Sequence, residues 1–151
     1  MPFTFPFETL LNMKKNLEEL SQMRLAKKVG QLREQEEEIQ RVIEENLSRE
    51  RALKEKMERG MKASEYIVYK LYQEDWCQDL QLKQEAKKQT IKEIEAEQNI
   101  LIKLVKERKM FERLKEKQWK RFQYQMEKLD QKNNDDMVIT RYHPSPKVGL
   151  S

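Results

Sequence analysis

The absence of chain breakers constrains this sequence more than any other feature. Between Met61 and His143 the chain runs for 83 residues without a glycine or a proline. Domains built from short strands and tight turns place these residues at their turns. Charged residues make up 38% of the chain and apolar residues 37%, which is too polar for a round core but sufficient for long helices that each bury one apolar edge. The sequence therefore predicts an all-α protein with very long helices.

A turn is predicted close to Gly60. Glycine can end a helix in the left-handed conformation, Ser64 can cap the helix that follows, and Glu65 suits its positive end. Pro6 suits the first turn of the preceding helix because its missing N–H would have no partner there. We expect helix one over about residues 6–59, the turn over about 60–64, helix two over about 65–132, and a disordered tail over 133–151 that begins at the sequence NNDD.

Apolar residues of the first helix recur with coiled-coil spacing. Leu10, Met13, Leu17 and Leu20 are followed by two seven-residue ladders, at positions 25, 32, 39, 46 and 53 and at positions 29, 36, 43, 50 and 57. Polar residues interrupt these ladders at Glu36, Asn46 and Glu50. With a turn near Gly60, this pattern favours a long antiparallel two-helix coiled-coil hairpin over residues 1–132. A parallel homodimer is the alternative geometry.

The second helix is expected to carry a basic stripe. Residues 101–132 hold eleven Lys or Arg against five Asp or Glu, whereas residues 31–100 hold thirteen against seventeen. On a helical wheel the cations of one side are Lys103, Lys106, Lys109, Arg113, Lys117 and Lys120, and the apolar residues roughly opposite are Leu101, Leu104, Phe111, Trp119, Phe122, Met126 and Leu129. Three charged residues, Arg108, Glu112 and Lys115, intrude on the apolar side and predict a seam that is locally weak or wet. The stripe is either a solvated face or a partner-binding face.

Two other uses of such a stripe are disfavoured. Nucleic-acid binding through stacked bases would need exposed aromatic rings, but these rings point toward the first helix. Insertion into a membrane surface would need a free apolar face, and the hairpin uses that face.

A second informative stretch is the segment Ser64–Leu80, the densest apolar part of the chain. Tyr69, Tyr72, Trp76 and Leu80 form one helical stripe, while Ile67, Val68 and Leu71 lie on another side. One partner helix cannot cover both sides. Either the apolar residues that the first helix does not cover pack under the turn, or one of the two sides binds another protein.

The sequence offers no sign of an enzyme. It lacks a glycine-rich phosphate loop and metal-ligand spacing, and its one histidine, His143, lies in the predicted tail. We therefore expect no catalytic residue, no cofactor and no metal.

The single cysteine, Cys77, cannot form an internal disulfide, which fits a reducing cytosol. We also expect no targeting signal and no membrane-spanning segment, since no apolar run approaches 18 residues.

Three short motifs resemble the flagellar export protein FliJ family. They are FTFPFETLL at residues 3–11, with Phe7 where the family usually has leucine, RKMFERLKEK at residues 108–117, and EKLD at residues 127–130, followed by Gln131 in place of a common second acid. Their order and spacing cover about residues 3–132. The proline-containing tail is not a feature of the family.

The resemblance implies a function in flagellar type III protein export. Members of the family are antiparallel coiled coils that insert into the hexameric export ATPase, contact the membrane export gate and help to recycle export chaperones. The resemblance places them in the cytoplasm, at the inner-membrane export apparatus. By the same resemblance the ATPase ring would be contacted by Phe3, Phe5, Phe7, Lys103, Lys106, Lys109, Arg113, Lys117 and Lys120, and the gate by Tyr69, Tyr72, Trp76 and Leu80. The alternatives are the stalk protein of a virulence secretion system, a coiled-coil scaffold and a substrate-binding chaperone.

Overall fold

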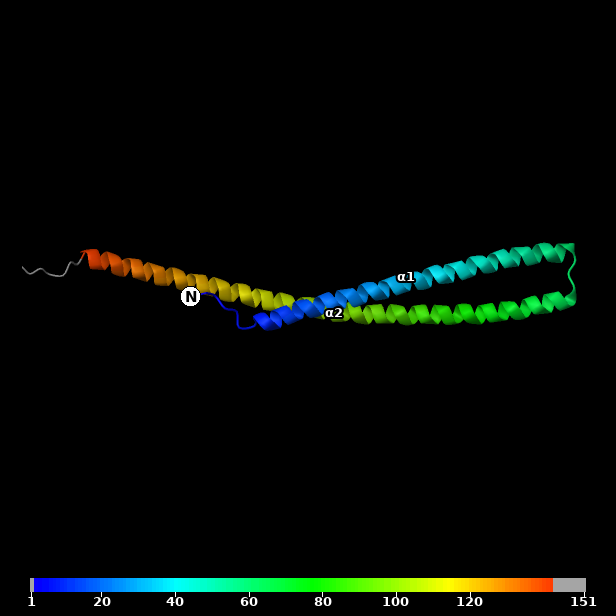
Figure 1. The fold of residues 1–151 in the computed structure, drawn as a ribbon, viewed down its shortest axis with the longest axis horizontal. Coiled ribbons are helices and arrows are strands. Elements are labelled where there is room, and N and C mark those ends of the chain that lie inside the picture. The colour runs from blue at the N-terminus through cyan, green and yellow to red at the C-terminus, as the bar shows by residue number, and fades with distance from the viewer. Residues whose placement is uncertain (1, 143–151) are drawn as a thin grey trace, which may run out of the picture. The chain divides into compact units, whose positions relative to one another are not determined.

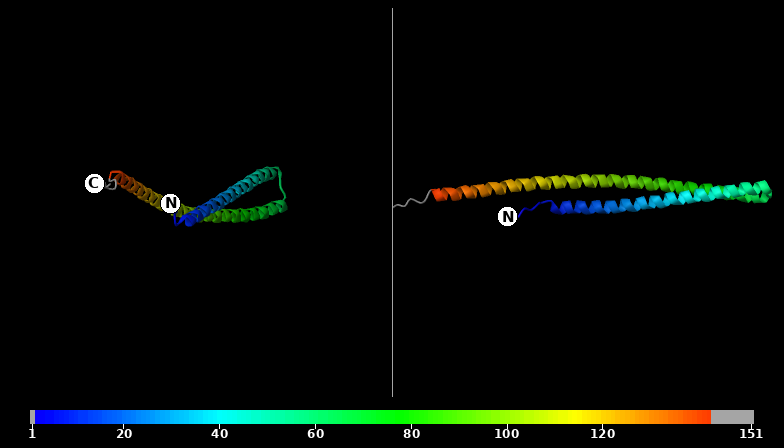
Figure 2. Two further views of the ribbon diagram at one scale, coloured as in Figure 1. Left: turned by 60° about the vertical axis from the view of Figure 1, so that its left-hand side comes forward. Right: turned by 90° about the horizontal axis from the view of Figure 1, so that it is seen from above.

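The computed structural model describes residues 2–142 and confirms the predicted fold class. Within this range the secondary structure consists of two helices, α1 (Glu8–Arg59) and α2 (Ala63–Tyr142). They run in opposite directions and pack against each other as an antiparallel hairpin (Figures 1 and 2). Their contacts fall into two units, a terminal unit (Met1–Asn16 with Val105–Ser151) and a turn unit (Leu17–Leu104). The side chains that contact a partner can therefore be examined within each unit.

The connection between the helices follows the prediction at Gly60 but not at Ser64. Gly60 has φ of 103°, and its N–H donates to the carbonyl of Met57 at 3.3 Å, so it ends α1 in the conformation that glycine adopts most easily. Ser64, in contrast, lies inside the first turn of α2. The backbone N–H groups of Glu65 and Tyr66 donate to the carbonyl of Lys62 at 3.1 and 3.2 Å, so the helix begins two residues earlier than a Ser64 cap would allow.

The start of α1 lies at Glu8, two residues after the predicted start at Pro6. The N–H of Glu8 donates to the carbonyl of Phe5 at 3.2 Å, and that of Leu11 donates to the carbonyl of Phe7 at 2.9 Å. Residues 2–5 precede this turn as a non-helical segment. Because this segment does not continue the axis of α1, it can pack along the surface of α2.

The seam between the helices follows a seven-residue repeat on α1, but the prediction of its second ladder is wrong by one residue. The ladder Leu25, Leu32, Ile39, Asn46 and Leu53 is buried or half-buried, as predicted. The other ladder consists of Ser21, Lys28, Gln35 and Val42. Of the positions predicted for it, Ile43 is half-buried, whereas Val29, Glu36, Glu50 and Met57 are exposed. The same shift applies earlier, because Leu11 is 1% exposed while Leu10 is 40% exposed. Polar residues hold these seam positions because α2 supplies partners for most of them.

Those partners make the seam partly polar. The Ser21 hydroxyl donates to the Glu97 carboxylate at 2.9 Å, and both residues are buried. The Lys28 ammonium pairs with the Glu93 carboxylate at 3.1 Å. Asn46 is also buried, but it donates to the Glu50 carboxylate of its own helix, at 3.3 Å. Hydrogen-bonded groups of this kind can occupy a coiled-coil seam without the full cost of burying an unpaired polar atom.

The predicted end of helix two near Lys132 is wrong, because α2 continues to Tyr142. Asn and Asp each disfavour a helix by only a few tenths of a kcal/mol relative to alanine, so the sequence NNDD does not suffice to stop one. Within this stretch the Thr140 hydroxyl donates to the carbonyl of Asp136 at 2.8 Å. Of the predicted tail, residues 133–142 are therefore helical, and residues 143–151 lie outside the described part of the chain.

Candidate partner-binding surfaces

The N-terminal segment of the terminal unit is a strap of aromatic residues that packs on α2. The ring of Phe3 lies 5.2 Å from that of Trp119, edge to face, and 5.5 Å from that of Phe122. Phe7 lies 6.2 Å from Phe111, and Phe5 is only 5% exposed. Each such ring pair adds about 0.5–1.5 kcal/mol beyond the area that it buries. The strap therefore covers part of α2.

This packing changes how the three phenylalanines can contact a partner. Phe5 is buried and Phe3 is half-buried, so neither presents a free ring while the strap is in place. Phe7 is 39% exposed and remains accessible at the edge of the strap. The resemblance implied all three as partner contacts, but a sequence alone cannot show that Phe3 packs on Trp119 and Phe122, more than a hundred residues away.

The basic stripe of α2 lies on the exposed side of the helix. Exposed positions include Lys106, Lys109, Arg113, Lys117 and Lys120 in the terminal unit and Lys103 in the turn unit. Lys120 pairs with Glu116 at 3.3 Å, one helical turn away. Among the described residues, no carboxylate lies within ion-pair distance of Lys106, Lys109, Arg113 or Lys117. These four charges are therefore available to an anionic partner.

Cations on the opposite side of the terminal unit behave differently. Lys115 pairs with Glu8 at 2.8 Å, Lys14 pairs with Glu107 at 2.6 Å, and Arg108 pairs with Glu112 at 3.0 Å. The first two of these pairs join α1 to α2. The carboxylates of Glu8, Glu107 and Glu112 are therefore engaged on the seam side, and the outer cations of the stripe are not paired with them.

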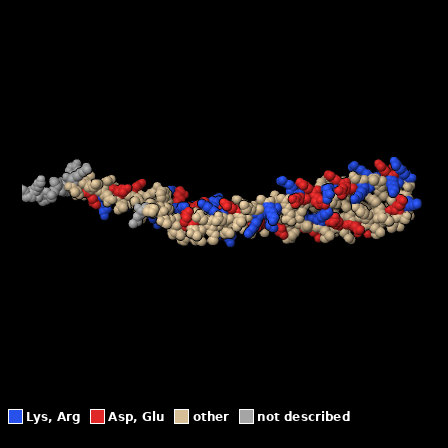
Figure 3. Space-filling view, viewed as in Figure 1, with Lys and Arg blue, Asp and Glu red and all other residues tan. Residues whose placement is uncertain are grey.

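Acidic and basic residues are distributed less evenly along the turn unit than the total over residues 31–100 indicates. Residues 49–70, around the turn, hold seven basic and four acidic residues, whereas residues 31–48 and 71–100 together hold six basic and thirteen acidic residues. Figure 3 shows both signs side by side over this part of the molecule. The acidic excess therefore lies away from the turn itself.

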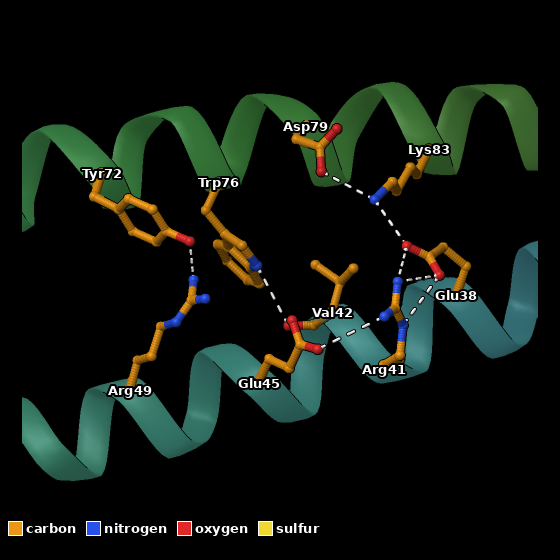
Figure 4. Close-up of polar contacts among 9 residues, drawn as sticks. All are labelled: Glu38, Arg41, Val42, Glu45, Arg49, Tyr72, Trp76, Asp79 and Lys83. Carbon is orange, nitrogen blue, oxygen red and sulfur yellow. Dashed lines mark hydrogen bonds and ion pairs between the residues drawn. The ribbon is translucent and has the colours of Figure 1, made fainter.

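The predicted aromatic stripe near the turn forms part of the seam. Tyr69, Trp76 and Leu80 are half-buried, and the Trp76 indole N–H donates to the carbonyl of Val42 on α1 at 3.3 Å (Figure 4). Tyr72 is 47% exposed, and its hydroxyl accepts from the Arg49 guanidinium, whose carbon atom lies 4.7 Å from the tyrosine ring centre. Of the four predicted contact residues, Tyr72 is thus the one that the structure leaves largely exposed.

Next to this stripe a charged network links the two helices. Glu38 accepts from Arg41 on its own helix and from Lys83 on α2, and Lys83 also pairs with Asp79 at 3.1 Å (Figure 4). The hydrogen bond from Arg41, followed by that from Lys83, holds the pKa of Glu38 below its usual value. Asp79 and then Glu38 raise the pKa of Lys83. Arg41 and Asp79 are exposed, and Glu38 and Lys83 are only half-buried, so the network orients side chains more than it stabilises the fold.

The apolar surface that the aromatic stripe does not use lies on the outside of α2. Ile67, Val68 and Leu71 are each more than half exposed. Val68 also lines an open groove of about 610 Å³ between the end of α1 and the start of α2, whose walls include Leu53, Met61 and Tyr69. Sequence reasoning left open which apolar side of this segment was free. The structure shows that it is the side of Ile67, Val68 and Leu71.

These features define a class of protein, a long antiparallel helical hairpin with exposed basic and apolar surfaces on α2. Within the described residues, no group of three or more His, Cys, Asp or Glu side chains could hold a metal ion. Neither α1 nor α2 contains a stretch that is long and apolar enough to cross a membrane in the part of the chain that the structure covers.

Comparison with known protein families identifies the chain more closely. The family model described as "Flagellar FliJ protein" matches residues 3–147, nearly the whole sequence, so the chain belongs to the flagellar FliJ family. Family membership implies a non-catalytic component of the flagellar export apparatus. The comparisons with curated proteins and with solved structures each give no match.

Proposed function

We propose that this protein is the stalk of the flagellar type III export apparatus and joins a hexameric export ATPase to the membrane export gate. Family membership supports the setting, and the hairpin gives the stalk two surfaces with different chemistry. It would act in the cytoplasm, next to the inner membrane. An additional role as an escort for export chaperones follows from the resemblance, and we assign no residue to it.

The observation that carries the ATPase contact is the set of four cations without carboxylate partners on α2. Lys106, Lys109, Arg113 and Lys117 lie on one exposed face, and Lys103 and Lys120 extend it in sequence. Unpaired cations attract acidic surfaces over several ångströms, and this attraction weakens as salt screens it. Phe7 is the aromatic residue of the strap that can join this contact directly, while Phe3 and Phe5 support it by fixing the strap.

A pull-down on the purified ATPase tests this contact. Reversing Lys109, Arg113 and Lys117 to glutamate should weaken binding at low salt by at least tenfold, because three attractive charges become repulsive. The matched control reverses Arg51, Lys54 and Lys62, three exposed cations near the turn, and should leave binding nearly unchanged. Equal binding by the wild type and the first triple variant would disprove the assignment.

For the gate contact we propose Tyr72 together with the exposed apolar residues beside it. Tyr69, Trp76 and Leu80 would support this surface from the seam rather than contact the gate through free side chains. The surface contains Ile67, Val68 and Leu71, and an apolar patch of this kind is a common anchor for protein partners.

Swimming motility and gate binding provide the test. Changing Ile67 and Leu71 to serine should reduce both without altering helix content. Leu82→Ser, which changes an exposed leucine farther along α2, is the control and should have little effect. Full motility in the double variant would exclude this role.

A further inference from the structure

The exposed face of α2 in the terminal unit has a shallow groove in addition to its positive charge. A shallow, open groove of about 630 Å³ is lined by Lys106, Lys109, Arg113 and Lys117 together with Met110, Phe111 and Leu114, all from α2. The four cations span twelve residues, from Lys106 to Lys117, and the eleven steps between these ends cover about 16 Å along a helix. The groove is therefore long enough for about three turns of another helix.

The centre of this groove is apolar. Met110 is 59% exposed although cations surround it. Phe111 and Leu114 are half-buried and form the floor, and Phe111 is held from behind by Phe7. A methionine side chain adapts its shape to an incoming apolar group. Attraction of charges alone would not need an apolar centre supported in this way.

We propose that this groove binds an acidic helical segment of a partner protein, with one large apolar side chain of that segment seated on Met110. Carboxylates spaced three and four residues apart lie on one face of a helix and can meet the cations on both sides of the anchor. This inference rests on the proposed function, since it gives the chemistry of the partner that meets the basic face. It adds an apolar anchor to a contact otherwise explained by charge.

The groove distinguishes this partner from two other anionic surfaces. Phe3 packs on Trp119 and Phe122, and Trp119 remains 42% exposed, so the strap occupies part of the aromatic surface that could stack on the bases of a nucleic acid. A flat lipid surface would meet the cations but has no single side chain to fill the concave centre. Nucleic acid and anionic vesicles therefore serve as competing probes in the test.

The experiment measures binding of synthetic peptides to the full chain by titration. The probe is a fourteen-residue helical peptide with glutamates on one face and a single central leucine; its two matched peptides carry alanine or lysine at the leucine position. We expect the leucine peptide to bind and the other two to bind roughly five- to tenfold more weakly, as burial of one apolar side chain predicts. Raising the salt concentration should weaken all three, but the advantage of leucine should persist.

Variants of the protein complete the test. Met110→Ala should remove most of the advantage of leucine, while Met23→Ala, at an equally exposed methionine elsewhere, should retain it. Equal binding of the leucine and alanine peptides, no effect of Met110→Ala, or tighter binding of anionic vesicles or nucleic acid would each overturn the inference. Failure of the proposed ATPase contact would be visible separately, because the peptide titration contains no ATPase.

Discussion

The two units of the hairpin reach similar helix packing by different means. In the terminal unit an aromatic strap covers α2, and ion pairs on the seam side use the nearby carboxylates, which leaves the outer cations unpaired. In the turn unit, polar residues enter the seam itself, and ion pairs such as Lys83 with Glu38 and Asp79 link side chains beside the seam. The first arrangement leaves charge available to a partner, whereas the second leaves apolar residues available. The difference indicates that each unit is suited to a different kind of contact.

The largest effect should come from removing the apolar seam of the terminal unit. Leu11→Ala should lower the free energy of unfolding by about 2–3 kcal/mol, because it deletes a fully buried side chain and leaves a cavity. Thermal unfolding followed by circular dichroism measures the change. Leu10→Ala is the matched control and should cost less than about 1 kcal/mol, since that side chain is half-exposed. A larger loss at Leu10 than at Leu11 would show that the seam has the register predicted from the sequence.

The next effect should come from the polar seam of the turn unit. Ser21→Ala removes the hydroxyl that donates to the buried carboxylate of Glu97. Leaving a buried acceptor without its donor should cost about 1–3 kcal/mol of unfolding free energy. Denaturant titration measures this loss, and Ser48→Ala, at an exposed serine of the same helix, should change little. Equal stability of the two variants would mean that water replaces the hydroxyl, and that the polar seam adds no specific stability.

The strap should give a smaller effect, confined to the terminal unit. Phe3→Ala should cost about 1 kcal/mol and should shift the fluorescence of Trp119 to longer wavelength, because the ring loses its cover. The measurement needs a Trp76→Phe background so that Trp119 is the single emitter. Phe7→Ala, which loses the contact with Phe111 instead, should leave the emission unchanged. An unchanged spectrum in Phe3→Ala would contradict the strap.

Sequence reasoning was most successful where local chemistry decides the structure. The long stretch without glycine or proline and the glycine at the turn were enough to predict two helices and their connection. The seam was predicted less well, since apolar residues such as Leu10 and Val29 flank it, while Ser21 and Lys28 lie within it. Hydrogen bonds to α2 make those polar positions acceptable, and pairings between residues distant in sequence are not visible in a seven-residue pattern.

The partner surfaces, too, could be predicted where a local sequence pattern decides them, but not where contacts between distant residues do. The side of α2 that carries the basic stripe could be predicted from helical periodicity, and the structure leaves those residues exposed. The strap could not be predicted, although the alternating aromatic residues of FTFPF, interrupted by Pro6, signal a non-helical apolar segment. Near the turn, periodicity separated two apolar sides of α2 correctly. It could not decide which of them faces α1, because that depends on the geometry of the turn.

The smallest effect should be the pH dependence of the charged network in the turn unit. The pKa of Glu38 lies below its ordinary 4.5, chiefly because of the hydrogen bond from Arg41 and then that from Lys83. The stability that Glu38 contributes should therefore be complete above pH 4.5 and should be lost as the pH falls through its lower folded value. A carbon-13 NMR titration of the Glu38 carboxyl group measures this directly. Arg41→Gln should raise its pKa more than Lys83→Met does, and Arg51→Gln should leave it unchanged. If Lys83→Met had the larger effect, the link between the helices, rather than the pair within α1, would control this carboxylate.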